Sequence, residues 1–238
     1  MLRHSIVPTA LLAITLSLAA GCGGGASSAG EASPPGSESA LSDPTAEDAF
    51  AESLLLTSDD FPTGWVHLAY ERDPREAAPE PSRPCIENQF PGQTGSAIGG
   101  EFSDENTTLL SINPSVFVFD GAASAQAAAE AIMSNVQCYA DRVGDGMDVN
   151  ETFAVGKTYT EALEAEALGA TAAIRLYETQ IYKSANSSDS DVLVFDIVVV
   201  VDGHILYEVD GFQRYWPIDQ NLLKHYVDKA REKIGQHQ

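Results

Sequence analysis

The position with the strongest chemical consequence is an acidic residue, Asp196, which stands within a run of β-branched residues. Alternation along a strand puts its side chain on the same face as those of Val194 and Val198. A buried carboxylate must be paired or protonated. Two interpretations stay open: Asp196 is a pocket acid that recognises a donor or a cation of a ligand, or it forms a structural ion pair with Arg175 on the neighbouring strand. We favour the ion pair because buried charges are usually paired.

Short catalytic and cofactor-binding motifs are absent from the sequence, which contains no GxSxG, HExxH, GxxxxGK or GxGxxG. Ser96 stands near glycines, but their offsets do not fit a nucleophile elbow, so a flexible bend is predicted there. The acidic segment from Asp141 has a glycine at its sixth position, as a calcium loop does, yet Val143 and Thr152 replace two of the required ligands. These patterns predict a protein that is not an enzyme and that holds no cofactor or metal.

Two further groups of residues allow either a binding role or a structural one. Tyr215 and Trp216 follow the last predicted strand, where an aromatic pair forms a lip for a ligand or covers the edge of the sheet. The final helix carries an excess of cations, which either complement the negative end of the helix dipole or form a patch for a partner. These cations are Lys224, Lys229, Arg231 and Lys233.

The charge balance excludes one class of partner. The 238 residues include 13 Lys and Arg against 35 Asp and Glu, which gives a formal net charge of −22. Nucleic-acid binding requires a basic footprint that this chain lacks. Hydrophobic residues make up 44% of the sequence, which is enough for a packed core, and the length suits one domain with appendages.

The N-terminus has the pattern of an export signal. Arg3 precedes an apolar stretch over residues 6–20, which is too short to span a membrane. The segment Leu18–Cys22 resembles a bacterial lipobox, and this resemblance implies cleavage before Cys22 and attachment of a diacylglycerol to its sulfur. It predicts a signal peptide over residues 1–21 and a protein held on the extracytoplasmic face of the cell membrane by a lipid anchor. The alternative is ordinary secretion, with Cys22 lost or left as a spare thiol.

A stalk and a disulfide are predicted beyond the signal. Residues 22–42 are rich in Gly, Ser and Pro and cannot bury enough apolar surface to fold. Residues 43–238 form the folded part. With Cys22 acylated, Cys85 and Cys138 are the remaining thiols. Their pairing closes a loop of about 54 residues and stabilises the fold by roughly 4 kcal/mol in the chain-entropy model.

The predicted folded part contains sequence signals for several helices. Asp43 and Pro44 predict a helix start, with Asp43 as the N-cap. An apolar stripe that includes many alanines predicts a helix over residues 124–140. Asp219 is predicted to cap the closing helix. For residues 161–168, a short helix and an irregular connection both remain open.

Strand signals concentrate in the second half of the chain. Three segments rich in β-branched and aromatic residues predict an antiparallel meander. They are residues 170–182, 191–201 and 204–212. The last turn of the meander, at Asp202 and Gly203, is expected to be of type I′. One or two further strands are predicted within residues 97–119, where Pro114 restricts the part of the chain before it to an edge or a bulge.

Together these elements predict an α+β fold, a twisted antiparallel sheet with helices packed against it in a single domain. Their order resembles that of small extracytoplasmic actinobacterial lipoproteins and, more distantly, the PknH-like extracellular sensor domain of mycobacterial Ser/Thr kinases. The resemblance is carried by Leu56–Trp65, Cys85, the Ala-rich helix up to Cys138 and the hairpin before the closing helix. It implies a binding or sensing module without catalysis and identifies no ligand.

The sequence therefore predicts a lipid-anchored, extracytoplasmic binding or sensor-like module that contacts the membrane through its anchor. Its partner is an unidentified small molecule, lipid or cell-envelope protein, and not a nucleic acid. The candidate ligand-binding residues are Asp196, Arg175, Tyr215 and Trp216. The alternative function is a carrier that holds a lipid or another hydrophobic ligand in an apolar cavity between the sheet and the helices.

Overall fold

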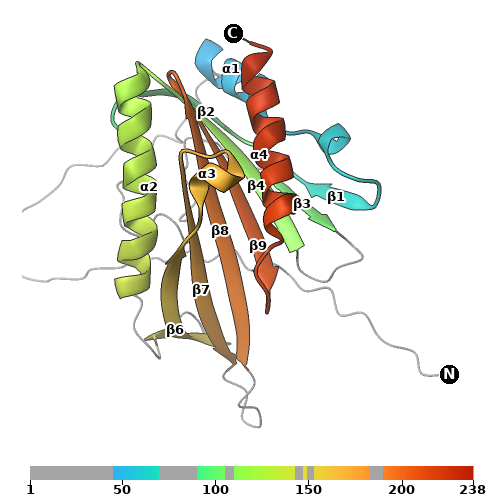
Figure 1. Cartoon of the computed structure of the whole chain (residues 1–238), viewed down its shortest axis with the longest axis vertical. Coiled ribbons are helices and arrows are strands. Elements are labelled where there is room, and N and C mark those ends of the chain that lie inside the picture. Colours follow the sequence, from blue (N-terminus) through green and yellow to red (C-terminus); the bar gives the residue numbers. More distant parts are fainter. Residues whose placement is uncertain are drawn as a thin grey trace, which may run out of the picture. The chain divides into compact units, whose positions relative to one another are not determined.

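An antiparallel sheet of nine strands forms the centre of the structure, a computed structural model that describes residues 45–69, 90–104, 110–142, 147–148, 153–182 and 190–237. Helix α2 (Ala122–Arg142) covers one face of the sheet. Helices α1 (Ala46–Leu54) and α4 (Gln220–Gly235) cover the other face, and the short α3 (Ala165–Leu168) contacts α4 (Figure 1). The described residues fall within one compact unit. The predicted α+β architecture is therefore confirmed.

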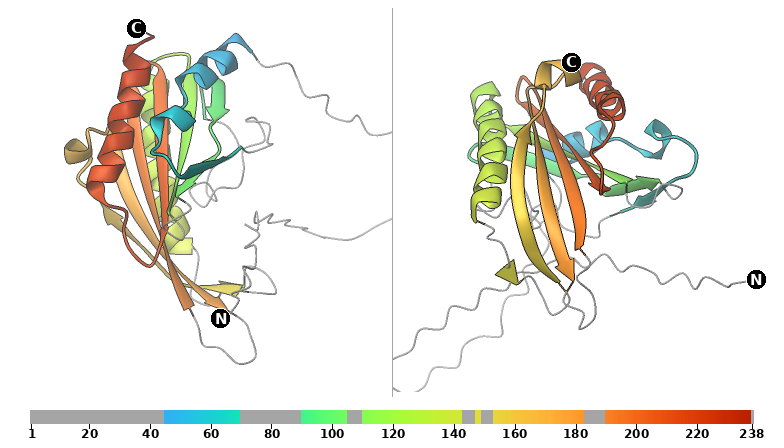
Figure 2. Two further views of the ribbon diagram at one scale, coloured as in Figure 1. Left: turned by 90° about the vertical axis from the view of Figure 1, so that its right-hand side faces the viewer. Right: turned by 60° about the horizontal axis from the view of Figure 1, so that its bottom comes forward.

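The strands follow the order β1-β3-β4-β9-β8-β7-β6-β5, and β2 pairs with the end of β4 beyond β3. Their bounds are β1 (Trp65–Leu68), β2 (Gln93–Ile98), β3 (Glu101–Asp104), β4 (Leu110–Phe119), β5 (Met147–Asp148), β6 (Phe153–Ala162), β7 (Ala172–Tyr182), β8 (Ser190–Asp202) and β9 (Ile205–Arg214). The predicted meander corresponds to β7, β8 and β9 (Figure 2). Both faces of β8 are buried, since Val198 packs on the α4 side and Val199 on the α2 side.

The predicted apolar stripes of the two long helices are the faces that pack on the sheet. On α2 the stripe includes Ala128, Ala129, Ile132 and Val136, and on α4 it includes Leu223, Tyr226, Val227, Ala230 and Ile234. Asp219 caps α4 as predicted, because its Oδ1 accepts a hydrogen bond from the backbone N–H of Asn221 at 2.7 Å. At α1 the N-cap is Thr45 and not Asp43, because Thr45 and Asp48 form a reciprocal capping box.

Pro114 lies within the ten-residue strand β4, so the expectation of an edge or a bulge at this proline is wrong. On one side of β4, Pro114 lies opposite Val209 of β9. On the other side, its carbonyl accepts a hydrogen bond from the N–H of Gly99 at 2.8 Å. In an antiparallel strand the nitrogen and the carbonyl of one residue point to the same side. The missing N–H therefore faces the junction of β2 and β3, and the ladder to β9 loses no donor.

Two smaller expectations are also corrected, and one strand was not predicted. Ser96 belongs to β2 and not to a flexible bend. The hairpin between β8 and β9 has the two-residue loop Gly203-His204, in which Gly203 alone has a positive φ (58°), so the turn matches type II′ and not type I′. Strand β6 has no counterpart among the expected elements, because a bulge between Val155 and Thr158 interrupts its alternation.

The segment 161–168 divides between the end of β6 and the four-residue helix α3. Among the described residues, none of the helices combines the length and the hydrophobicity of a membrane span. The predicted signal peptide, the stalk with Cys22, and Cys85 lie outside the described residues, so these expectations stay predictions.

Candidate binding sites

Asp196 and Arg175 form an ion pair, as we predicted from the sequence. They lie directly opposite each other on β8 and β7. Arg175 Nε donates to Asp196 Oδ1 at 2.5 Å, and Nη2 donates to Oδ2 at 3.1 Å, so the contact is bidentate. The Asp196 side chain is 0% exposed and that of Arg175 is 7% exposed. A charge this deeply buried is stabilised by its partner and not by water.

The ion pair lies beneath the segment that connects β9 to α4. Asp196 also accepts a hydrogen bond from the backbone N–H of Ile218. Gly211 lies opposite Asp196 on β9, and a Cβ added to Gly211 would come within 2.4 Å of Ile218 Cδ1. Burial raises the pKa of Asp196, and the hydrogen bonds and charge of Arg175 oppose that rise. Because the Asp196 side chain is fully buried beneath this segment, a ligand in solvent does not reach its carboxylate.

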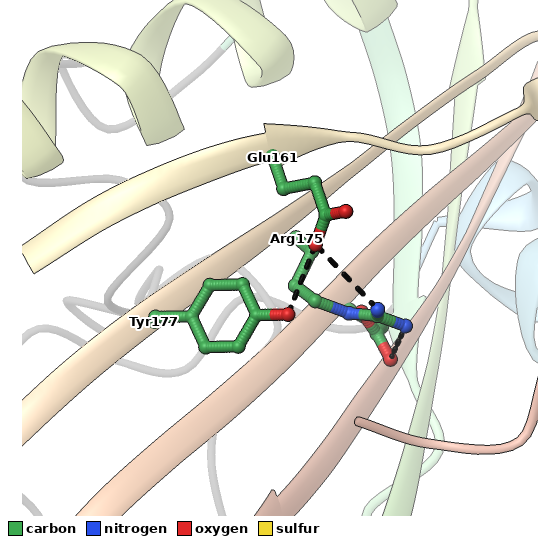
Figure 3. A network of polar contacts seen from close by, with 4 residues as sticks. Glu161, Arg175 and Tyr177 are labelled. Carbon is green, nitrogen blue, oxygen red and sulfur yellow. Dashed lines mark hydrogen bonds and ion pairs between the residues drawn. The ribbon is translucent and has the colours of Figure 1, made fainter. Parts of the chain in front are cut away.

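From Arg175 a polar network reaches the surface of the sheet (Figure 3). Glu161 on β6 lies opposite Arg175, and its Oε2 is 3.8 Å from Arg175 Nη1. Tyr177, two residues further along β7, donates its hydroxyl hydrogen to the same Glu161 oxygen at 2.9 Å. The Glu161 side chain is 54% exposed. The buried pair therefore continues into a carboxylate that solvent and ligands can reach.

A second polar cluster surrounds Asp191 at the start of β8. Its Oδ2 accepts a hydrogen bond from the Tyr182 hydroxyl at 2.7 Å, and its Oδ1 accepts one from the Tyr215 hydroxyl at 2.5 Å. Arg214 Nη1 lies 3.1 Å from Oδ2. Burial raises the pKa of Asp191, but the two phenol hydrogen bonds and the charge of Arg214 outweigh this, so that the pKa lies below its ordinary value. Asp191 is thus a charged anchor for three side chains.

Asp191 holds the first residue of an exposed aromatic pair that follows β9. Tyr215 has a φ of 74°, a left-handed conformation that costs a bulky residue of the order of 1–3 kcal/mol. Its N–H donates to the carbonyl of Val192 at 2.7 Å, so both its backbone and its hydroxyl are fixed. The neighbouring Trp216 is 71% exposed. We call Tyr215 and Trp216 the aromatic edge.

The four predicted ligand-binding residues do not form one site. Asp196 and Asp191 are five residues apart on β8, whose pairing with both neighbours is regular, and so their side chains face opposite sides of the sheet. Arg175 belongs with Asp196, and the aromatic edge belongs with Asp191. Five members of these clusters were not predicted from the sequence. They are Glu161, Tyr177, Tyr182, Asp191 and Arg214.

The cations of α4 do not form an open patch. Lys224 pairs with Asp228 at 2.7 Å, and Lys229 pairs with Glu232 at 3.5 Å, both on the same helix. The other two contact distant segments: Lys233 pairs with Asp60 at 3.1 Å, and Arg231 Nε donates to the carbonyl of Gly169 at 2.6 Å. Each cation therefore has a partner within the fold, and the structure does not favour a docking patch here.

Metal ligands do not converge within the part of the chain that the structure describes, since no group of three or more His, Cys, Asp and Glu side chains could hold an ion there. Cys138 lies on α2 and is half-buried, while its predicted partner Cys85 lies outside the described residues. Their pairing therefore stays a prediction.

The chain has a distant likeness to a protein of known structure. No protein-family model matches the sequence, and no curated protein matches it at a significant level. Among solved structures, the chain is similar to the crystal structure of the extracellular domain of PknH from Mycobacterium tuberculosis, with 15% identity and a TM-score of 0.40. The match covers 80% of this chain and 98% of that one. At this identity and TM-score the likeness carries no functional argument.

Proposed function

We propose that the chain is a lipid-anchored, extracytoplasmic binding module of the sensor-like kind, without catalytic activity, and that the aromatic edge is its contact surface. The observation that carries the proposal is the geometry of Tyr215 and Trp216. A left-handed backbone and a hydrogen bond to Asp191 fix Tyr215, and Trp216 follows it directly with most of its side chain exposed to solvent. Strain of this kind persists where the surrounding structure over-determines it, and it clusters at functional sites.

Aromatic residues suit recognition because they offer a large apolar area at a small cost in conformational entropy. Trp216 is the most exposed of the large hydrophobic side chains that the structure describes. The hydroxyl of Tyr215 is engaged by Asp191, so its ring is held in one orientation before a partner arrives. A pre-ordered surface loses less entropy on binding than a mobile one.

The proposed absence of catalysis is supported by how two acidic groups of these clusters, Asp191 and Asp196, are used. Asp191 accepts hydrogen bonds from two phenols and lies beside Arg214. Asp196 is closed in by Arg175 and Ile218. General acid or base catalysis needs a group within reach of the substrate. Both carboxylates are committed to positioning protein groups instead.

The proposed location rests on the sequence of Leu18–Cys22. A lipid on Cys22 would tether the folded part to the membrane, since the acidic surface itself is repelled by anionic lipids. Replacing Cys22 with Ala should move the chain from the membrane fraction to the soluble fraction and make its processing insensitive to globomycin. Unchanged detergent partitioning and processing would refute the anchor, whether or not the aromatic edge binds a partner.

The carrier alternative requires an apolar cavity of several hundred cubic ångströms, by the usual size of ligand sites. The side chains of α4 that face the sheet are fully buried against it, and Ile218 lies within contact distance of Gly211. This packing favours the binding module over the carrier.

Site-specific photo-cross-linking tests the aromatic edge. A photoreactive phenylalanine analogue replaces Trp216 in the anchored full chain, and a control chain carries it at Leu68, a half-exposed hydrophobic residue on β1. The proposal expects a discrete adduct from position 216 on intact cells and none of the same mass from position 68. Equal adducts from both positions, or none from position 216, would count against it.

A further inference from the structure

The outer strands β6 and β7 carry a second aromatic surface, remote in sequence from the aromatic edge. Tyr159 and Tyr177 lie directly opposite each other on these strands. Their rings are stacked, with centroids 4.5 Å apart and an interplanar angle of 13°. Tyr159 is 49% exposed, so about half of this side chain is accessible to solvent and to a ligand. An open aromatic face carries the negative lobe of the ring quadrupole and attracts cations.

The bulge in β6 brings Tyr159 to this face. Val155 lies opposite Gln180 and Thr158 lies opposite Glu178, so two residues of β6 between these pairs match the single residue Thr179 of β7. In a strand with regular alternation, Val155 and Tyr159 would share a face, because they are four positions apart. Instead Val155 is buried and Tyr159 is exposed. Bulges re-aim side chains in this way and are frequent beside functional sites.

A carboxylate lies beside the tyrosine stack. Glu161 is two residues from Tyr159 on the same strand, and its Oε2 accepts the hydroxyl hydrogen of Tyr177. The nearby guanidinium of Arg175 gives Glu161 only a long contact at 3.8 Å, because its bidentate hydrogen bonds go to Asp196. The single guanidinium of Arg175 thus faces two carboxylates, Asp196 and Glu161. These three side chains together carry a net negative charge, and Glu161 is the exposed one.

The protein already places one of its own cations here. Lys157 Nζ lies 6.0 Å from the centroid of the Tyr159 ring, at the outer limit of a cation–π contact. Lys157 is exposed and belongs to the bulged segment. An ammonium group therefore reaches this ring from solvent without disturbing the sheet.

We infer that Tyr159, Tyr177 and Glu161, which we call the tyrosine surface, bind a lysine or arginine side chain in a basic segment of a partner protein. The aromatic face and the carboxylate together match an alkylammonium or guanidinium group, and the net charge of −22 steers basic segments toward the chain. Lys157 competes for the Tyr159 ring and is displaced on binding. This inference is independent of the aromatic edge.

Fluorescence anisotropy of a labelled tetralysine peptide tests the tyrosine surface, with the full chain held in phosphatidylcholine nanodiscs. Glu161→Gln should weaken binding about three- to tenfold, and Tyr159→Leu should have a similar effect, as expected for one cation–π contact and one charge contact. Glu166→Gln is the matched control, because Glu166 is an exposed acid on α3 and the change in net charge is the same. It should alter the affinity by less than about twofold.

Removing the competing cation gives a second, opposite readout. Lys157→Met should tighten peptide binding more than Lys229→Met does, although both substitutions remove one positive charge from an exposed or half-buried lysine. An unchanged melting temperature in each variant shows that folding is intact. Equal losses in Glu161→Gln and Glu166→Gln, or equal effects of the two lysine substitutions, would overturn the inference, since either result would mean that the acidic surface binds the peptide without a defined site.

Discussion

The Tyr139 hydroxyl donates a hydrogen bond to Glu178 Oε2 at 2.5 Å, across the interface between α2 and β7. Glu178 is 5% exposed, and Gln180 Nε2 is its other partner at 3.4 Å. Among the described residues, no cation pairs with Glu178. Burial raises the pKa of this carboxyl, and the hydrogen bonds from Tyr139 and Gln180 offset only part of the rise. The end of α2 therefore contacts a carboxylate, Glu178, whose ionisation destabilises the folded state.

This arrangement predicts a pH-dependent effect of Glu178→Gln. Because the pKa of Glu178 is raised in the folded state, the folded chain binds its proton more tightly, and the stabilisation is lost as the pH rises through the folded-state pKa. Glutamine stays neutral and can accept the Tyr139 hydrogen bond. The variant should gain stability relative to the parent at neutral pH and lose that advantage near pH 4. Urea unfolding at several pH values measures the difference, with Glu166→Gln as an exposed control. A difference independent of pH would contradict the assignment.

The Arg175–Asp196 pair predicts a strongly non-additive mutant cycle. Arg175→Met leaves Asp196 buried without its cation, which should cost about 3–5 kcal/mol in the free energy of unfolding. Asp196→Leu leaves the guanidinium with the distant Glu161 and should also destabilise the fold. The double variant should recover much of the loss, since no charge then remains unpaired. Losses that simply add in urea unfolding would show that the two side chains do not act as a pair.

The aromatic edge predicts that binding and stability can be separated. Trp216→Ala should change the free energy of unfolding by less than about 0.5 kcal/mol, because the side chain is largely exposed. Tyr215→Phe removes a hydrogen bond to a charged acceptor and should lower the stability more than Trp216→Ala does. Thermal unfolding of the two variants measures both values. A large loss of stability in Trp216→Ala would identify Trp216 as a packing residue and not as a contact residue.

The predicted disulfide has a direct chemical test. If Cys85 and Cys138 are paired and Cys22 is acylated, the unfolded and unreduced mature chain has no reactive thiol. Breaking the bridge with Cys138→Ser should destabilise the fold by roughly 4 kcal/mol in the chain-entropy model. A thiol-reactive dye counts the free groups before and after reduction. Two reactive thiols before reduction would exclude the pairing.

The sequence predicts the elements whose side-chain patterns are regular. The meander of β7, β8 and β9 and the two long helices follow their apolar periodicity, and the regular pairing of β7 with β8 brings Arg175 opposite Asp196. Strand β6 escapes prediction because its bulge changes which residues share a face. The environment of Pro114 is not predictable in the same way, because a strand accepts a proline only where the proline nitrogen faces away from a strand that needs its hydrogen bond.

The functional clusters are less predictable than the elements. Asp191 meets Tyr182 and Tyr215 only when the register of β7, β8 and β9 is set. The left-handed backbone of Tyr215 has no sequence signal, because a tyrosine rarely adopts it. The tyrosine surface depends on the bulge that positions Tyr159. These sites are therefore properties of the register and not of local sequence.

The measurement that bears most directly on the proposed function is the cross-linking yield from position 216 in cells, compared between the parent chain and a chain that also carries Tyr215→Phe. The second substitution keeps the ring but removes its hydrogen bond to Asp191. We predict a discrete adduct in the parent and a clearly lower yield in the Phe variant, because the Tyr215 ring is then less firmly oriented. A discrete adduct whose yield is unaffected, or no adduct in the parent, would contradict it.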